Sequence, residues 1–74
     1  MEVIVKKKEV LEKYPNQYFI YFDFLKEEKK TIVTPKTLSF LKIDSINVGD
    51  KINVSRGFKS YKEFFLVRGV LKNA

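Results

Sequence analysis

Apolar and polar side chains alternate most regularly in residues 17–25, which read QYFIYFDFL. Successive side chains of a β-strand point to opposite faces, so this pattern predicts a strand with two largely apolar faces. One face carries Tyr18, Ile20, Phe22 and Phe24, and the other carries Phe19, Tyr21, Asp23 and Leu25. We expect Phe22 and Phe24 to be buried. Tyr18 and Tyr21 fit either the core or a surface, because a phenol can face water without penalty.

Four other segments have strand patterns, namely residues 2–11, 30–33, 51–55 and 61–71. Turn signals separate them at residues 14–16, 26–29 and 47–50, where proline, asparagine, glycine or clustered charges occur. Glycine inside a strand costs packing and permits unusual dihedral angles, so we expect a bulge or bend at residues 56–57.

A short helix is predicted between the third and fourth strands. Thr34 supplies a capping hydroxyl directly before Pro35, and proline is favoured at the first helical position. Leu38 and Leu41 are three residues apart and would share one face of a helix that ends near Lys42.

The last strand has two different faces. Tyr61, Glu63, Phe65, Val67 and Leu71 would form the side that faces the interior, with Glu63 near its edge. The opposite face mixes cations with apolar side chains, namely Lys62, Phe64, Leu66, Arg68 and Val70. This second face could cover a small additional core, form a dimer contact, or bind a ligand.

Three strands, a short helix and two strands follow the element order of the OB-fold, a five-stranded and partly open Greek-key barrel. We therefore expect one all-β, OB-like domain over residues 1–74, which is close to the smallest size that supports its own core. An SH3-like barrel is the alternative, because it also has five strands, with a 3₁₀ turn in place of the helix.

Composition excludes several kinds of chemistry. The chain has no cysteine and no histidine, so it lacks disulfides, thiolate metal ligands and the commonest general base. The sequence contains no cluster of carboxylates that would suggest a metal site. We expect a cytoplasmic protein that is not an enzyme and uses no cofactor. The apolar runs are too short to span a membrane.

Charge is concentrated at the carboxyl-terminal end of the chain. Residues 51–74 hold six basic residues and one acid, Glu63, for a net of +5, whereas residues 1–50 hold nine basic and eight acidic residues, a net of +1. Aromatic residues are interleaved with these cations. Cations attract phosphates and exposed rings stack on unpaired bases, so the pattern indicates binding of single-stranded nucleic acid.

The candidate binding residues follow from these two roles. Arg56, Lys59, Lys62 and Arg68 would contact phosphates, while Phe58, Phe64 and either Tyr18 or Tyr21 would stack on bases. Lys6 and Lys8 could extend the basic surface. The hypothesis requires the side chains of the two last strands to gather on a common outer surface.

Two segments also carry a family resemblance. VSRGFKSYKEFFLVRGVL, residues 54–71, resembles the last two strands of the gene V type single-stranded DNA-binding proteins of filamentous phages. NQYFIYFD, residues 16–23, resembles their second strand. The resemblance implies an OB-like fold, a homodimer and cooperative, sequence-tolerant coating of single-stranded DNA during replication.

Matched by position, the resemblance makes Lys59 and Arg68 phosphate contacts and Phe64 a stacking ring, with Glu63 equally aligned. Tyr18 would match the tyrosine of the second strand. The long arginine-bearing loop of that family is reduced here to residues 12–16, which contain no arginine.

The sequence therefore predicts sequence-nonspecific binding of single-stranded nucleic acid, with DNA favoured, by a protein encoded by a phage or another mobile element. The alternative is a protein-interaction module, such as an SH3-like barrel or a phage-encoded inhibitor of a host protein, whose rings form an interface hot spot. Binding of duplex RNA or a ribosome by a basic barrel is a third possibility.

Overall fold

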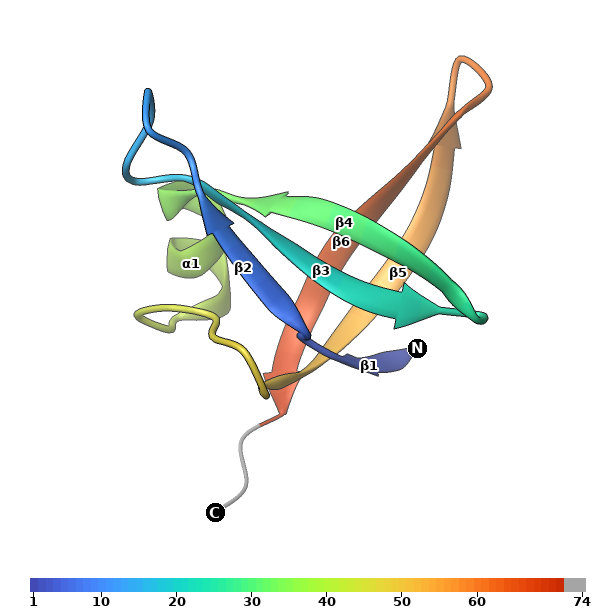
Figure 1. The fold of residues 1–74 in the computed structure, drawn as a ribbon, viewed down its shortest axis with the longest axis horizontal. Helices are drawn as coiled ribbons and strands as arrows, with labels where there is room; N and C mark the ends of the chain where they lie inside the picture. The colour runs from blue at the N-terminus through green and yellow to red at the C-terminus, as the bar shows by residue number, and fades with distance from the viewer. Residues whose placement is uncertain (72–74) are drawn as a thin grey trace.

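The computed structural model describes residues 1–71, so Lys72, which contributes to the predicted charge, lies outside the described residues. The fold is mostly β-structure with one short helix (Figure 1). Its elements are β1 (Glu2–Ile4), β2 (Lys7–Val10), β3 (Tyr18–Phe24), β4 (Glu27–Val33), α1 (Pro35–Leu41), β5 (Lys51–Lys59) and β6 (Lys62–Leu71).

The six strands form two antiparallel sheets, with the orders β1-β5-β6 and β2-β3-β4. The predicted all-β fold and the helix between the predicted third and fourth strands are confirmed. The predicted count of five strands is wrong, because residues 1–71 form six, and within these residues the two sheets do not close into a single hydrogen-bonded barrel.

The extra strand arises because the predicted first strand is divided. The backbone N–H of Val5 donates to Asp50 O at 2.9 Å, beside the first sheet, and that of Lys6 donates to Tyr21 O at 2.8 Å, in the second sheet. The chain therefore passes from one sheet to the other between these two residues. The lysine-rich half becomes β2.

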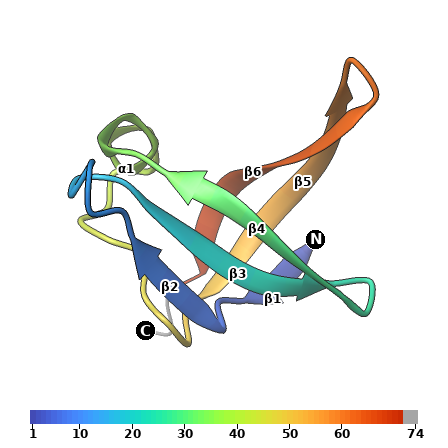
Figure 2. The ribbon, with the colours of Figure 1, turned by 45° about the horizontal axis from the view of Figure 1, so that its top comes forward.

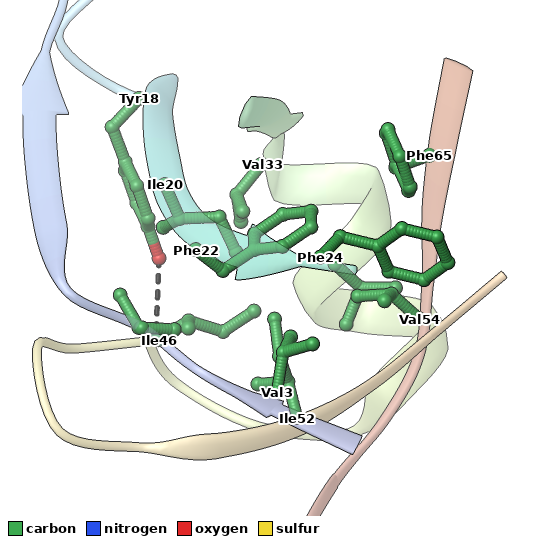
Figure 3. Close-up of a cluster of buried hydrophobic side chains, with 12 residues drawn as sticks. Val3, Tyr18, Ile20, Phe22, Phe24, Val33, Ile46, Ile52, Val54 and Phe65 are labelled. Carbon is green, nitrogen blue, oxygen red and sulfur yellow. Dashed lines mark hydrogen bonds between the residues drawn. The ribbon is translucent and has the colours of Figure 1, made fainter. Parts of the chain in front are cut away.

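The core lies between the two sheets and is built around the apolar face of β3. Phe22 and Ile20 are completely buried and Phe24 nearly so, as the alternation predicted (Figure 3). Phe65 of β6 packs edge-on against Phe22 and Phe24, with ring centroids 5.4 Å and 5.0 Å away. These aromatic contacts hold the two sheets together.

Both tight hairpins turn on two residues with positive φ. In the β3–β4 turn these are Leu25 and Lys26, so the prediction of a tip at residues 26–29 is wrong and β4 begins at Glu27. In the β5–β6 turn they are Ser60 and Tyr61, with φ of 51° and 65°. Positive φ at both central residues matches the right-handed twist of the flanking strands.

The irregularity in the last hairpin is not at residues 56–57, so the predicted bulge there is wrong. The register passes from Asn53 opposite Gly69 to Val54 opposite Val67, which leaves Arg68 without a partner. An extra residue reverses the alternation of the strand beyond it. Val70 therefore packs against the core, while Leu71, which was predicted to face inward, is exposed.

The helix forms as predicted. The Thr34 hydroxyl accepts a hydrogen bond from the Thr37 N–H at 3.3 Å, Pro35 occupies the first turn, and Lys42 ends the helix with φ of 58°. Leu38 and Leu41 pack against the core. None of the described residues forms a helix long and apolar enough to cross a membrane.

Candidate nucleic-acid interface

The β5–β6 hairpin continues past the core and projects from the body of the molecule (Figure 1). We call residues 56–64 the arm. Directly opposed residues of an antiparallel pair point to the same face, so the register assigns each side chain to one of two faces. The inner face continues the side of Val54 and Phe65, which are buried, and the outer face is the opposite side.

The outer face of the arm carries Phe64 next to a pair of lysines. Lys59 lies opposite Lys62, and Gly57 lies opposite Phe64. A Cβ atom at Gly57 would approach the Phe64 ring to 2.5 Å, so the absence of a side chain allows the ring to lie across the neighbouring strand. The ring is 40% exposed. Leu66 continues this face along β6, and Arg68, the unpaired residue of the bulge, lines the same groove as Leu66.

The cations of the outer face have no acidic partners. Neither Lys59, Lys62 nor Arg68 has a carboxylate within 4.0 Å among residues 1–71. Lys59 and Lys62 also oppose each other across the hairpin, which is an unfavourable pairing of like charges. An anion bound between them would relieve this repulsion.

The inner face of the arm is different, because its charges are compensated. The Arg56 guanidinium carbon lies 5.5 Å from the ring centroids of both Phe24 and Phe58, and its Nη1 is 3.7 Å from Glu63 Oε2. The prediction of one common outer surface is therefore wrong for Arg56 and Phe58, which point to the opposite side. Phe58 is nevertheless 66% exposed.

Glu63 is held on this inner side by β4. Lys29 Nζ lies 2.9 Å from Glu63 Oε1 and 3.0 Å from Glu27 Oε2. The hydrogen bond to Glu63, followed by that to Glu27, raises the pKa of Lys29 above its ordinary value. The only acid of the carboxyl-terminal segment is thus turned away from the outer-face cations.

The tip of the arm adds an aromatic ring that the sequence pattern assigned to the interior. Tyr61 is fully exposed, so that prediction is wrong. Its position in the turn, with positive φ, removes it from the alternation of β6. Left-handed geometry costs roughly 1–2 kcal/mol for a residue with a side chain. The arm therefore presents a ring at its end at some cost in stability.

Tyr18 does not belong to this surface. It is buried, and its hydroxyl accepts a hydrogen bond from the backbone N–H of Ile46 at 2.9 Å (Figure 3). Lys8 Nζ covers the ring from 4.2 Å. The predicted stacking role for Tyr18 is wrong because both the hydroxyl and the ring are already occupied within the protein.

Tyr21 is half-buried on the outer face of the β2-β3-β4 sheet and does not join the arm. Its hydroxyl donates to Glu9 Oε1 at 2.9 Å, and Lys7 Nζ lies 5.0 Å from its ring centroid. Lys6 is also neutralised there, with Asp23 at 3.1 Å and Glu28 at 3.0 Å. This face mixes acids with cations and suits a polyanion less well than the outer face of the arm.

A ring on α1 was overlooked in the sequence. Phe40 is 78% exposed. The signal was present, because the helical spacing that puts Leu38 and Leu41 on one face turns Phe40 away from it.

Comparison of the chain with protein-family models, curated proteins and solved structures finds no match to any of them. The resemblance to the gene V type proteins stays a prediction.

Proposed function

We propose that this protein binds single-stranded nucleic acid, with DNA favoured, without reading its sequence. The observation that carries the proposal is the outer side of the last two strands. There Lys59, Lys62 and Arg68 have no carboxylate within 4.0 Å among the described residues, and the Lys59–Lys62 pair lies next to the exposed ring of Phe64. Phosphates would neutralise the cations, and an unpaired base would stack on the ring.

The proposal is for single strands rather than duplexes because the bases of a duplex have no open face for a ring to stack on. Phe58 and Tyr61, on the inner face and at the tip, provide further exposed rings around which a flexible strand can bend. The outer-face ligands are charges and a ring, which contact phosphates and the π-faces that all bases share. Binding should therefore be tolerant of sequence.

We also propose that the fold is OB-like. If β1 and β2 are taken as two halves of one bent strand, the order becomes three strands, a helix and two strands. The edges of β4 and β6 approach each other where the Thr31 hydroxyl donates to Phe65 O at 2.7 Å. The hairpin between the last two strands is also one of the loops with which OB-folds contact oligonucleotides.

The salt dependence of binding tests the mechanism. Fluorescence anisotropy with a labelled oligothymidine should give a log affinity that falls against log salt with a slope of roughly −2 for three phosphate contacts. Lys59→Gln combined with Lys62→Gln should reduce the magnitude of that slope by about 1.4. A wild-type slope near zero would reject phosphate neutralisation even if binding were observed.

The matched control removes the same number of charges elsewhere. Lys26 lies in the β3–β4 turn, and Lys51 lies at the start of β5, 4.0 Å from Glu2. Lys26→Gln combined with Lys51→Gln should leave the slope close to that of the wild type. Competition by duplex DNA and by single-stranded RNA in the same assay tests the preference for single strands and for DNA.

A protein partner is the second candidate, favoured by the exposed apolar side chains Ile32, Phe40 and Leu66. Lys59→Glu with Arg68→Glu separates the two functions. These substitutions should abolish binding to nucleic acid and leave capture of a non-acidic protein largely intact. Size-exclusion chromatography in the same buffer tests the proposed homodimer.

A further inference from the structure

An apolar groove lies where the outer face of β6 reaches the helix. Figure 2 shows α1 at the end of β4, far from the tip of the arm, with β6 passing behind β4. Residues of all three elements line a groove of about 300 Å³. Its exposed apolar lining is formed by Ile32, Phe40 and Leu66, and Arg68 and Lys36 provide its charge.

We propose that this groove binds one unstacked base of the same nucleic-acid strand, with Phe40 as its stacking platform. The inference rests on the proposed function. It extends the contact surface from the arm to the helix, along a path that no sequence pattern indicated.

Charge complementarity argues for a nucleotide. Lys36 and Arg68 are the only charged residues among those that line the groove, and neither has a carboxylate within 4.0 Å in residues 1–71. An apolar cleft with two cations and no acid matches a flat base with its phosphates. Phe40 is mostly in water, and a ring exposed to this degree is typical of a contact site.

Continuity with the arm argues for the same strand. Phe64 and Leu66 follow one another along the outer face of β6, and Arg68 is the unpaired residue of the bulge two positions further. Leu66 and Arg68 both line the groove. A nucleic-acid strand that stacks on Phe64 and contacts Arg68 therefore reaches the groove directly.

The hydroxyl groups of the groove indicate that it does not recognise a base through hydrogen bonds to the edge of that base. Thr31 gives its only donor to Phe65 O at 2.7 Å, and the 3.1 Å hydrogen bond between the hydroxyls of Thr34 and Thr37 uses the donor of one of them. Stacking and charge are left as the main sources of affinity, so we expect similar binding of different bases.

The test uses the full chain and an oligothymidine that carries a fluorescent 2-aminopurine, whose emission is quenched by stacking. Phe40→Ala should weaken affinity between about 5-fold and 150-fold and reduce the quenching. Phe40→Tyr should keep both, because a tyrosine ring stacks equally well. Phe40→Leu should behave like Phe40→Ala, because it keeps an apolar side chain but removes the ring.

The possible failures can be told apart. If the wild type binds with the expected salt slope but Phe40→Ala and Phe40→Leu bind equally well, the groove inference is overturned and the proposed function stands. If Phe40→Leu binds as tightly as the wild type while Phe40→Ala binds more weakly, stacking is overturned in favour of simple apolar contact. If Phe40→Ala converts a dimer to a monomer, the groove is a self-interface. If the wild type shows no salt-dependent binding, both proposals fail.

Discussion

At the scale of single residues, the surface is divided between side chains that are satisfied within the protein and side chains that are not. Tyr21 belongs to the first group, because its phenol donates to Glu9 and Lys7 lies over its ring. Lys59 and Lys62 belong to the second, with no carboxylate within 4.0 Å in the described part of the chain. Only the second group can exchange water for a ligand without first losing a protein contact.

The pH titration of Tyr21 tests whether its phenol is satisfied by contacts within the protein. Its hydrogen bond to Glu9, more than its burial and the Glu9 charge, raises the pKa of the phenol above 10.0. Because the folded-state pKa is raised, the stabilisation is complete below pH 10 and is lost as pH rises through the folded-state pKa. Ultraviolet titration should show a late ionisation that is absent in Tyr21→Phe.

Glu9→Ala should return that late transition towards the ordinary range, because both the acceptor and the neighbouring negative charge are removed. Glu9→Gln keeps an acceptor without the charge and should give an intermediate result. A titration curve that is the same in the wild type and in Glu9→Ala would mean that the hydrogen bond does not hold the phenol in solution.

At the scale of secondary-structure elements, the arm depends on the contact between Gly57 and Phe64. With its ring across the glycine, Phe64 covers backbone that the missing side chain leaves open. The ring is thereby held across the neighbouring strand, next to the Lys59–Lys62 pair on its tip side. This contact positions the residue that we propose as the stacking platform.

In a double-mutant cycle, this contact should appear as a change in the sign of the effect of Gly57→Ala on the free energy of unfolding. Gly57→Ala should destabilise the wild type, because the new Cβ would lie 2.5 Å from the Phe64 ring and the ring would have to move. In a Phe64→Ala background, the same substitution should stabilise by about 0.5–1 kcal/mol, the usual advantage of alanine over glycine. Urea unfolding measures both effects.

Gly69→Ala is the matched control, because a Cβ there would have nothing within 4 Å and no dependence on Phe64 is expected. Equal effects of Gly57→Ala in the two backgrounds would contradict the contact. Because the ring is displaced rather than removed, Gly57→Ala should also weaken oligothymidine binding in the direction of Phe64→Ala.

Alternation predicted the strands of the arm but not the faces of all their residues. The pattern predicted Phe65 and Val67 as interior, and both are buried. It misplaced Tyr61, since a turn on Ser60 and Tyr61 lacks the asparagine and glycine that usually mark such turns. The bulge at Arg68 was equally hidden, because a bulge depends on how two strands pair rather than on one strand alone.

At the scale of the whole molecule, the order of elements could be predicted, whereas the joint between the sheets could not. Periodicity and capping residues act locally and fix the strands and α1. The point at which the chain leaves one sheet for the other, between Val5 and Lys6, is set by distant partners at Asp50 and Tyr21. The same limit explains Tyr18, whose burial depends on Ile46.

The candidate site was likewise predictable only where local sequence decides the structure. Charge counting located the basic segment. Lys59, Lys62 and Phe64 share the outer face of the arm, while Arg68 lies beside the groove at α1. Arg56 was separated from them because alternation puts it on the same face as Val54, two residues earlier, which is buried. Phe40 reaches the groove through packing of α1 beside β6, which no local pattern specifies.

The joint between β4 and β6 provides the last prediction. The buried hydroxyl of Thr31 donates to Phe65 O at 2.7 Å, next to the Lys29–Glu63 ion pair, and so links the second sheet to the base of the arm. Thr31→Val keeps the shape but leaves this carbonyl without its donor, which should cost about 1–3 kcal/mol. Thr31→Ser, which keeps the hydroxyl, should cost less.

Hydrogen exchange can show whether the two sheets act as one cooperative unit. If they do, Thr31→Val should lower the protection of amides in β3 and in β5 by the same free energy, because both sheets open together. A loss confined to β4 and β6 would mean that the joint opens locally while the rest of each sheet stays closed. The arm would then be free to move against the β2-β3-β4 sheet, and a strand bound from Phe64 to Phe40 would have to hold the two together.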